Sequence, residues 1–310
     1  MIKLIFSRLL YRVINGNSFV ELYDNGTRRV RTIDRHCKYI ELDLPLSLDI
    51  NISNRCSNGC PYCYAGNTPT GNVADLLDMN YLKGISGIEI AINIQYPLPK
   101  NFKLWLEMMK QQNIIVNGTI NQLDFERDIN TLYTMKELKQ LDLLHGLGIS
   151  FRKYDETLYQ TIKEELGDDV VVHVIVGITP IDDIVKLLNN NFKVLILGYK
   201  QKNRGIDYFA NANIEVFKND IDKILNYNFK SVIAFDTAGL KQLDIKNKIS
   251  EKQWNNSYQG DEGTISFYID AVNKTFNIDS HTTKEPINID NLSLKEMFSI
   301  IKDKAGSKND

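Results

Sequence analysis

Three of the chain's 4 cysteines lie close together, in the segment Cys56-Ser-Asn-Gly-Cys60-Pro-Tyr-Cys63. Thiolates at this spacing can converge on one metal centre from a single loop, which favours metal ligands over a disulfide framework. Three thiolates leave one iron of a 4Fe–4S cluster without a protein ligand, and that iron can bind a chelating small molecule. The segment therefore predicts metal chemistry at a centre with one open position.

A structural zinc site is the alternative, because zinc also binds cysteine thiolates at short spacings. A closed zinc site needs a fourth ligand, and the nearest candidates are His36 and Cys37, well upstream of the triplet. Zinc knuckles usually use two pairs of ligands, whereas this segment offers one compact triplet. The competing functional hypothesis is thus a non-catalytic zinc-binding interaction module.

The cysteine segment resembles the signature of the radical S-adenosylmethionine (radical SAM) enzymes, in which three and then two residues separate the cysteines. Tyr62, an aromatic residue before the third cysteine, also matches. The resemblance implies that Cys56, Cys60 and Cys63 each bind one iron, and that S-adenosylmethionine chelates the fourth. One electron then cleaves the sulfonium, and the resulting 5′-deoxyadenosyl radical abstracts hydrogen from a substrate. The cofactor supplies this chemistry, while the protein places and shields it.

The same resemblance implies an external electron donor such as flavodoxin or ferredoxin, because the cleavage needs a low-potential electron. No cysteine follows Cys63 in the sequence, so we expect one cluster. We place Tyr62 among the cofactor-binding residues. The cysteine signature is the specific part of the resemblance.

Composition narrows the class of protein. The 310 residues are 43% hydrophobic and 25% charged, which is typical of a globular protein. The net charge of −2 argues against a broad nucleic-acid-binding surface. No apolar stretch approaches the length that crosses a bilayer. We therefore expect a cytoplasmic enzyme, in a compartment whose reducing conditions keep thiolates free.

From residue 45 to residue 240 an apolar strand, a loop and an amphipathic helix alternate, which predicts an α/β fold with a parallel sheet. Strands are expected over residues 48–52, 87–93, 114–119, 146–151, 170–177, 192–198 and 231–235. Helices are expected over residues 102–112, 134–144, 155–166, 182–190 and 219–226. The resemblance implies that these repeats form a partial (β/α)6 TIM-like barrel, the radical SAM core, with its site at the carboxyl ends of the strands.

Two extensions are expected to flank this core. Residues 1–44 read as short strands joined by turns at Asn15-Gly16 and Asn25-Gly26, and form an N-terminal β extension. Residues 241–310 form a C-terminal extension with a small hairpin around Asn273 and a final amphipathic helix over 292–304.

Candidate cofactor-binding residues follow the strand ends. Many family members end the second strand with Gly-Gly-Glu, which this chain lacks; Asn93 or Gln95 could instead offer an amide oxygen to the cofactor's amino group, with strand capping as the alternative. Ser150 and Arg152 fall where the family contacts the ribose and carboxylate. A guanidinium suits a carboxylate, and a surface ion pair is the alternative. The segment that ends in Val176-Gly177 resembles the one that borders adenine, where glycine permits close approach.

Candidate substrate-binding residues are polar groups at the same strand ends. Asn117 and Asn121 belong to the third strand, and loop polarity alone is their alternative explanation. Lys200 and Arg204 follow the sixth strand and could bind an anion, or face solvent. Asp236 could bind substrate or cap a helix. The substrate is expected to be a peptide or protein, or a nucleotide-like or other small anionic molecule.

Overall fold

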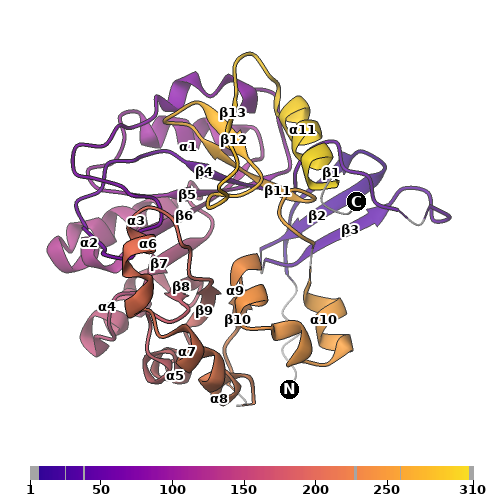
Figure 1. Cartoon of the computed structure of the whole chain (residues 1–310). Coiled ribbons are helices and arrows are strands. Elements are labelled where there is room, and N and C mark those ends of the chain that lie inside the picture. The colour runs from indigo at the N-terminus through magenta and orange to yellow at the C-terminus, as the bar shows by residue number, and fades with distance from the viewer. Residues whose placement is uncertain (1–6, 25, 38, 227–228, 259, 307–310) are drawn as a thin grey trace.

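The computed structural model describes residues 7–24, 26–37, 39–226, 229–258 and 260–306 (Figure 1). Asn25, part of one predicted turn, lies outside these residues. The described strands form a three-stranded sheet and a ten-stranded sheet. Within the described ranges no helix is long and apolar enough to span a membrane.

The N-terminal segment forms the smaller sheet from β1 (Leu9–Asn15), β2 (Ser18–Tyr23) and β3 (Arg28–Thr32), each antiparallel to the next. Gly16 lies in the first turn with φ 59°, and a Cβ there would come within 2.0 Å of the Glu41 carbonyl oxygen. Both features require glycine, as the predicted Asn-Gly turn implied. An ion pair between Arg28 and Glu89 links this sheet to the main one.

All seven strands predicted in the central region are present, and each pairs in parallel with the next along the chain. Their carboxyl ends therefore lie at one edge of the sheet, where sites of α/β proteins form. The strands are β4 (Ser47–Asn51), β5 (Glu89–Asn93), β6 (Ile115–Asn121), β7 (Leu147–Ser150), β8 (Val170–Ile175), β9 (Lys193–Leu197) and β10 (Ile233–Phe235).

Helices connect these strands, and α2 to α5 lie along one side of them in Figure 1. The five predicted helices correspond to α1 (Phe102–Gln111), α3 (Asn130–Gln140), α4 (Glu156–Leu166), α5 (Ile181–Asn189) and the short pair α7 (Ile214–Asp220) and α8 (Asp222–Leu225). The sequence patterns missed α2 (Gln122–Arg127) and α6 (Arg204–Tyr208). The C-terminal part adds α9 (Thr237–Gln242), α10 (Glu251–Ser257) and α11 (Leu294–Gly306).

The prediction of a partial (β/α)6 barrel with a separate C-terminal hairpin was wrong. The C-terminal strands β11 (Ser266–Asp270), β12 (Thr275–Asn277) and β13 (Ile287–Asn288) join the main sheet beside β4. The order is β10-β9-β8-β7-β6-β5-β4-β11-β12-β13, and no ladder between described strands closes it into a barrel. The architecture is an open, mostly parallel α/β sheet.

The edge of β4 explains why the hairpin joins the sheet. An unpaired strand edge exposes backbone hydrogen-bonding groups, and β11 covers it in parallel register, with Phe267 opposite Leu48 and Ile269 opposite Ile50. The alternating pattern of the hairpin predicted its strands correctly. It carries no information about which distant edge they join.

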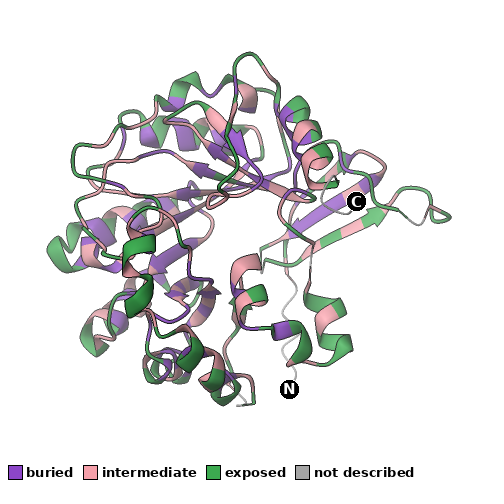
Figure 2. Cartoon of the chain, viewed as in Figure 1, coloured by how far each residue is buried: buried purple, intermediate pink, exposed green. Residues whose placement is uncertain are grey.

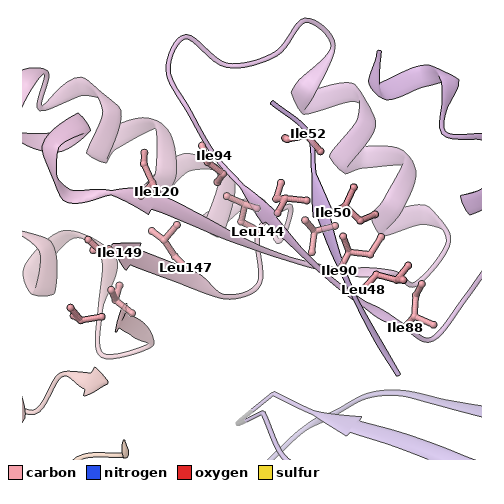
Figure 3. Packing of buried hydrophobic residues seen from close by; sticks show 14 of the residues in the cluster. Leu48, Ile50, Ile52, Ile88, Ile90, Ile94, Ile120, Leu144, Leu147 and Ile149 are labelled. Carbon is pink, nitrogen blue, oxygen red and sulfur yellow. The ribbon is translucent and has the colours of Figure 1, made fainter. Parts of the chain in front are cut away.

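The two faces of the main sheet differ in chemistry. One face is aliphatic and packs against helices; Figure 3 shows its side chains from β4 to β7, and Figure 2 shows the buried parts of strands and helices in purple. The alternate residues of β4 to β6 point to the other, open face, and most of them are polar: Ser47, Asp49, Asn51, Glu89, Asn93, Asn117, Thr119 and Asn121. Functional groups therefore collect on the open face.

We expect Phe267→Ala to lower the free energy of unfolding of the whole domain by about 3–5 kcal/mol. Phe267 is 2% exposed on β11 and packs on the rings of Phe276 and Phe298. Phe209→Ala is the matched control, since Phe209 is 42% exposed. Equilibrium urea denaturation measures both. An unchanged main transition for Phe267→Ala would contradict the joining of β11 to the sheet.

Candidate functional site

The three cysteines lie in the segment of residues 52–75 that follows β4, hereafter the cysteine loop. Its two arms pair through backbone hydrogen bonds: the N–H of Asn54 donates to Asn72 O (2.8 Å), and the N–H of Cys56 donates to Thr68 O (2.8 Å). Cys60 and Cys63 therefore lie on the tip between the arms, and Cys56 lies where the first arm enters the tip. This tip contains no described helix or strand, so its backbone needs partners elsewhere.

Asn93 at the end of β5 holds the base of the loop. Its Oδ1 accepts the N–H of Ile52 (3.0 Å), and its Nδ2 donates to Ser53 O (2.9 Å). This is the capping role that the sequence left open for Asn93. Gln95 differs, because its Oε1 is buried and has no hydrogen-bond partner among the described residues. The Gln95 Oε1 is therefore a buried acceptor without a partner among the described residues, whereas the amide of Asn93 is fully used.

Residues at the start of α6 hold one side of the tip. The Nε of Arg204 donates to Cys60 O and its Nη1 to Asn67 O, both at 3.0 Å. The Nδ2 of Asn203 donates to Tyr64 O at 2.7 Å. Arg204, proposed from the sequence as an anion ligand, thus uses its guanidinium to fix the backbone around the second cysteine.

Helix α2 holds the other side of the tip. The Nδ2 of Asn58 donates to Asp124 Oδ2 (3.3 Å), and Arg127 donates to Asn58 Oδ1 (2.7 Å) and Ser57 O (3.2 Å). Sequence reasoning missed these residues. Asn121 could have indicated a helix here, because it is a residue type that commonly begins helices. It caps α2 by accepting the N–H of Leu123 at 2.9 Å.

The thiols are half-buried and influence one another electrostatically. Burial first, and then the neighbouring thiols Cys63 and Cys56, raise the pKa of Cys60. Burial, together with Asp124 and Cys63, raises the pKa of Cys56. A bound cation would favour the thiolate forms that these surroundings disfavour.

The spacing of the sulfurs bears on which metal fits. The three sulfurs do not form a group in which all lie within 4.8 Å of one another. A single tetrahedral zinc ion with Zn–S bonds of about 2.3 Å would hold them about 3.8 Å apart. His36 and Cys37 also form no such group with them.

A pocket of about 260 Å³ adjoins the tip of the loop. It brings together three predicted site residues with one predicted metal ligand, and its lining residues are Asn58, Gly59, Cys60, Pro61, Tyr62, Asn121, Leu123, Arg152 and Ile178. Burial first, and then Cys60, raise the pKa of Tyr62 to about 12, so its phenol is neutral at pH 7. Asn121 also points its Nδ2 toward the Cys60 sulfur, 4.0 Å away.

The strand ends beyond β6 carry the remaining cofactor candidates. Arg152 lines the pocket and pairs with Glu126 (3.1 Å), so the predicted surface ion pair is present as well. Ser150 ends β7 and is half-buried. Val176 is fully buried. Gly177 has φ 75°, and a Cβ there would meet Ile214 at 2.9 Å, so packing of α7 already accounts for this glycine.

Asn117 and Asp236 have structural partners. Asn117 lies near the start of β6, away from the loop, where it donates to Glu89 Oε1 (3.3 Å) and accepts the N–H of Gly146 (2.8 Å). Asp236 caps α9 by accepting the N–H of Gly239 at 2.6 Å. The capping alternative named for Asp236 is therefore present.

Lys200 lies beside the cysteine loop, and Asp49 is a further charged residue near it. The Nζ of Lys200 is 3.8 Å from Asp236 and 4.7 Å from the centre of the Tyr64 ring. Burial lowers the pKa of Lys200, but Tyr64, Asp236 and Asp49 more than offset it, so that the pKa is raised. Asp49 lies on the polar face of the sheet, where its side chain keeps contact with solvent. The protein around it removes part of its hydration, and this loss raises the pKa of its carboxyl group. Sequence reasoning missed Asp49, and the sign that could have found it is a charged residue within an otherwise apolar strand.

Comparison with known proteins does not narrow the function. No family model matches the chain, and no curated protein matches its sequence. The function therefore has to be inferred from the residues of this chain and their arrangement.

We expect Arg204→Ala to release the tip of the cysteine loop. The substitution removes two hydrogen bonds from a charged donor, each contributing about 1.5 kcal/mol or more. Amide hydrogen exchange of residues 56–67 should accelerate about tenfold or more. Arg31→Ala, which removes an exposed arginine of β3, should leave this exchange unchanged. Equal protection in Arg204→Ala and the wild type would show that the guanidinium does not hold the loop.

His173 provides a pH prediction for the open face. It lies on β8 above Gly148, where a Cβ would come within 2.6 Å of the imidazole, and burial lowers its pKa from 6.5 to about 4. As the pH falls, His173 is protonated in the unfolded chain near pH 6.5 but in the folded protein only near pH 4. The contribution of neutral His173 to the free energy of unfolding is therefore fully present above pH 6.5 and is lost as the pH falls toward 4.

The slope should be up to about 1.4 kcal/mol per pH unit in the free energy of unfolding over this window. Urea denaturation at several pH values measures the slope, and His173→Gln removes this contribution. Imidazole resonances assigned by the same variant should show His173 neutral at pH 5 in the folded protein and protonated in urea. A folded-state titration near pH 6.5 would contradict the assignment.

Proposed function

We propose that the chain is a radical SAM enzyme that cleaves S-adenosylmethionine reductively and abstracts hydrogen from its substrate. The observation that carries the proposal is the cysteine triplet on a loop at the carboxyl edge of a parallel sheet, next to a pocket lined by Cys60, Tyr62 and Arg152. The alternative is a zinc-bound interaction module, whose closed site needs a fourth ligand; among the described residues, His36 and Cys37 form no compact group with the three cysteines.

The residues present fit a 4Fe–4S cluster with one iron open to S-adenosylmethionine. Cys56, Cys60 and Cys63 would hold three irons. Gln95 has a buried amide oxygen without a partner among the described residues, which suits an ammonium group. Arg152 lies in the pocket with donors that suit a carboxylate. When bound, the two cofactors supply a 5′-deoxyadenosyl radical.

The chain's own residues prepare the site in three ways. Arg204, Asn203 and Arg127 fix the loop backbone, so little ordering of the loop remains when the thiols bind metal. The raised pKa values of Cys56 and Cys60 mean that metal binding releases protons, and loading should weaken as the pH falls. Tyr62 contributes a neutral aromatic wall. An external donor such as flavodoxin or ferredoxin would deliver the electron.

The substrate belongs to one of two proposed classes, a peptide or protein, or a nucleotide-like or other small anionic molecule. Lys200 supports an anionic group in either class, because it is a cation next to Tyr64 of the cysteine loop whose side chain is only 15% exposed. Its pairing with Asp236 at 3.8 Å is loose enough for an incoming anion to compete.

Anaerobic reconstitution tests the proposed class. We expect about four irons and four sulfides per chain, and 5′-deoxyadenosine after dithionite and S-adenosylmethionine are added. Replacing Cys56, Cys60 or Cys63 by Ala should abolish both. Cys37→Ala is the matched control and should retain both, because Cys37 contacts Asn17 and Tyr39 in the N-terminal segment. Stoichiometric zinc without iron or cleavage would overturn the proposal in favour of a structural metal site.

A further inference from the structure

A second group of possible metal ligands lies outside the cysteine loop. Glu262 is in the turn before β11, and Asp279 and His281 are in the segment after β12. One ligand atom of each of the three lies within 4.8 Å of the other two. All three side chains are partly buried.

The C-terminal hairpin brings these residues together. Because β11 and β12 are antiparallel, the chain that enters β11 and the chain that leaves β12 lie at the same end of the hairpin. The Asp279 Oδ1 accepts the N–H groups of His281 (2.9 Å) and Thr282 (2.5 Å), which fixes the second segment. The N–H of Gly263 donates to Ser266 O at 2.7 Å and fixes the first. These hydrogen bonds fix the backbone of the two segments that carry the three residues.

The imidazole of His281 provides an independent observation. Its Nδ1 is fully buried and has no hydrogen-bond partner among the described residues, yet it lies 3.2 Å from Asp279 Oδ1. The two atoms are close but not aligned for a hydrogen bond. Two ligand atoms at about 2.1 Å from one ion are about 3.0–3.4 Å apart in tetrahedral or octahedral geometry. A cation shared with Asp279 would give the His281 Nδ1 its missing partner at the present separation of the two atoms.

The surrounding charges favour a cation. Asp49 and Asp236 face the group from β4 and from the end of β10, and each adds negative potential at Glu262. Lys200 faces it as well but is shared with Asp236 and Tyr64. Lys202 donates its Nζ to Ser280 O at 3.1 Å. With Glu262 and Asp279 themselves counted, four carboxylates and two ammonium groups lie together here.

We propose that Glu262, Asp279 and His281 bind one divalent transition-metal ion. Two carboxylates and an imidazole suit Mn²⁺ or Zn²⁺. The ion joins the turn before β11 to the segment after β12, and so fastens the strands that complete the sheet beside β4. This site uses none of the cysteines and is independent of the cluster.

Mn²⁺ titration followed by electron paramagnetic resonance tests the site in the full chain. The protein is first treated with a chelator, and the variant with Cys56, Cys60 and Cys63 replaced by Ala removes the other metal centre. We expect one bound Mn²⁺ per chain in that variant and displacement by Zn²⁺, which binds such ligands more tightly. Introducing Glu262→Gln or His281→Gln into this cysteine-free-loop variant should weaken its Mn²⁺ binding at least tenfold.

Asp261→Asn is the matched control, because Asp261 is next to Glu262 but half exposed and paired with Lys241. It should leave the affinity unchanged, and circular dichroism checks the fold of every variant. Asp279→Asn, which keeps an oxygen for the backbone N–H groups, gives a third test if another variant does not fold. Equal affinity in all variants, or no binding of Mn²⁺ and Zn²⁺, would overturn the site and leave an Asp279–His281 ion pair only.

Discussion

The cysteine loop depends on one constraint, which is that an irregular backbone needs hydrogen-bond partners that it cannot supply itself. Asn93 serves the base of the loop, Arg204 one side of the tip, and Arg127 the other. These residues come from three elements that are far apart in sequence. Correct folding of the sheet therefore precedes correct placement of the thiols, because the partners meet only when β5, α2 and α6 are all in place.

The same dependence explains how much the sequence predicts. The cysteine triplet and the seven parallel strands follow from local spacing and apolar periodicity, and both are visible without a structure. The joining of β11 to β4 is not visible, because a strand pattern does not specify its partner. The roles of Arg204 and Asn117 are hidden for a similar reason: a polar residue at a strand or loop end reads the same whether it binds a ligand or a backbone carbonyl.

Two further features lie beyond local patterns. Asp49 interrupts an apolar strand with a charge, and the sequence shows this without showing that Lys200 is its neighbour. Glu262 and His281 are ordinary polar residues of two connecting segments, and only the antiparallel hairpin places them side by side. In both cases topology, and not residue type, creates the electrostatics.

The parallel pairing of β4 with β11 also constrains the order of events during synthesis. Asn51 and Asp270 meet across a separation of 219 residues. The strand that leads to the cysteines thus keeps one edge unpaired until nearly the whole sheet has been translated, and such an edge can pair with other chains. Contacts of such long range also form slowly. A nascent chain therefore presents its thiols on an incomplete scaffold, so insertion of the proposed metal centre belongs after translation of β11 and its docking on β4.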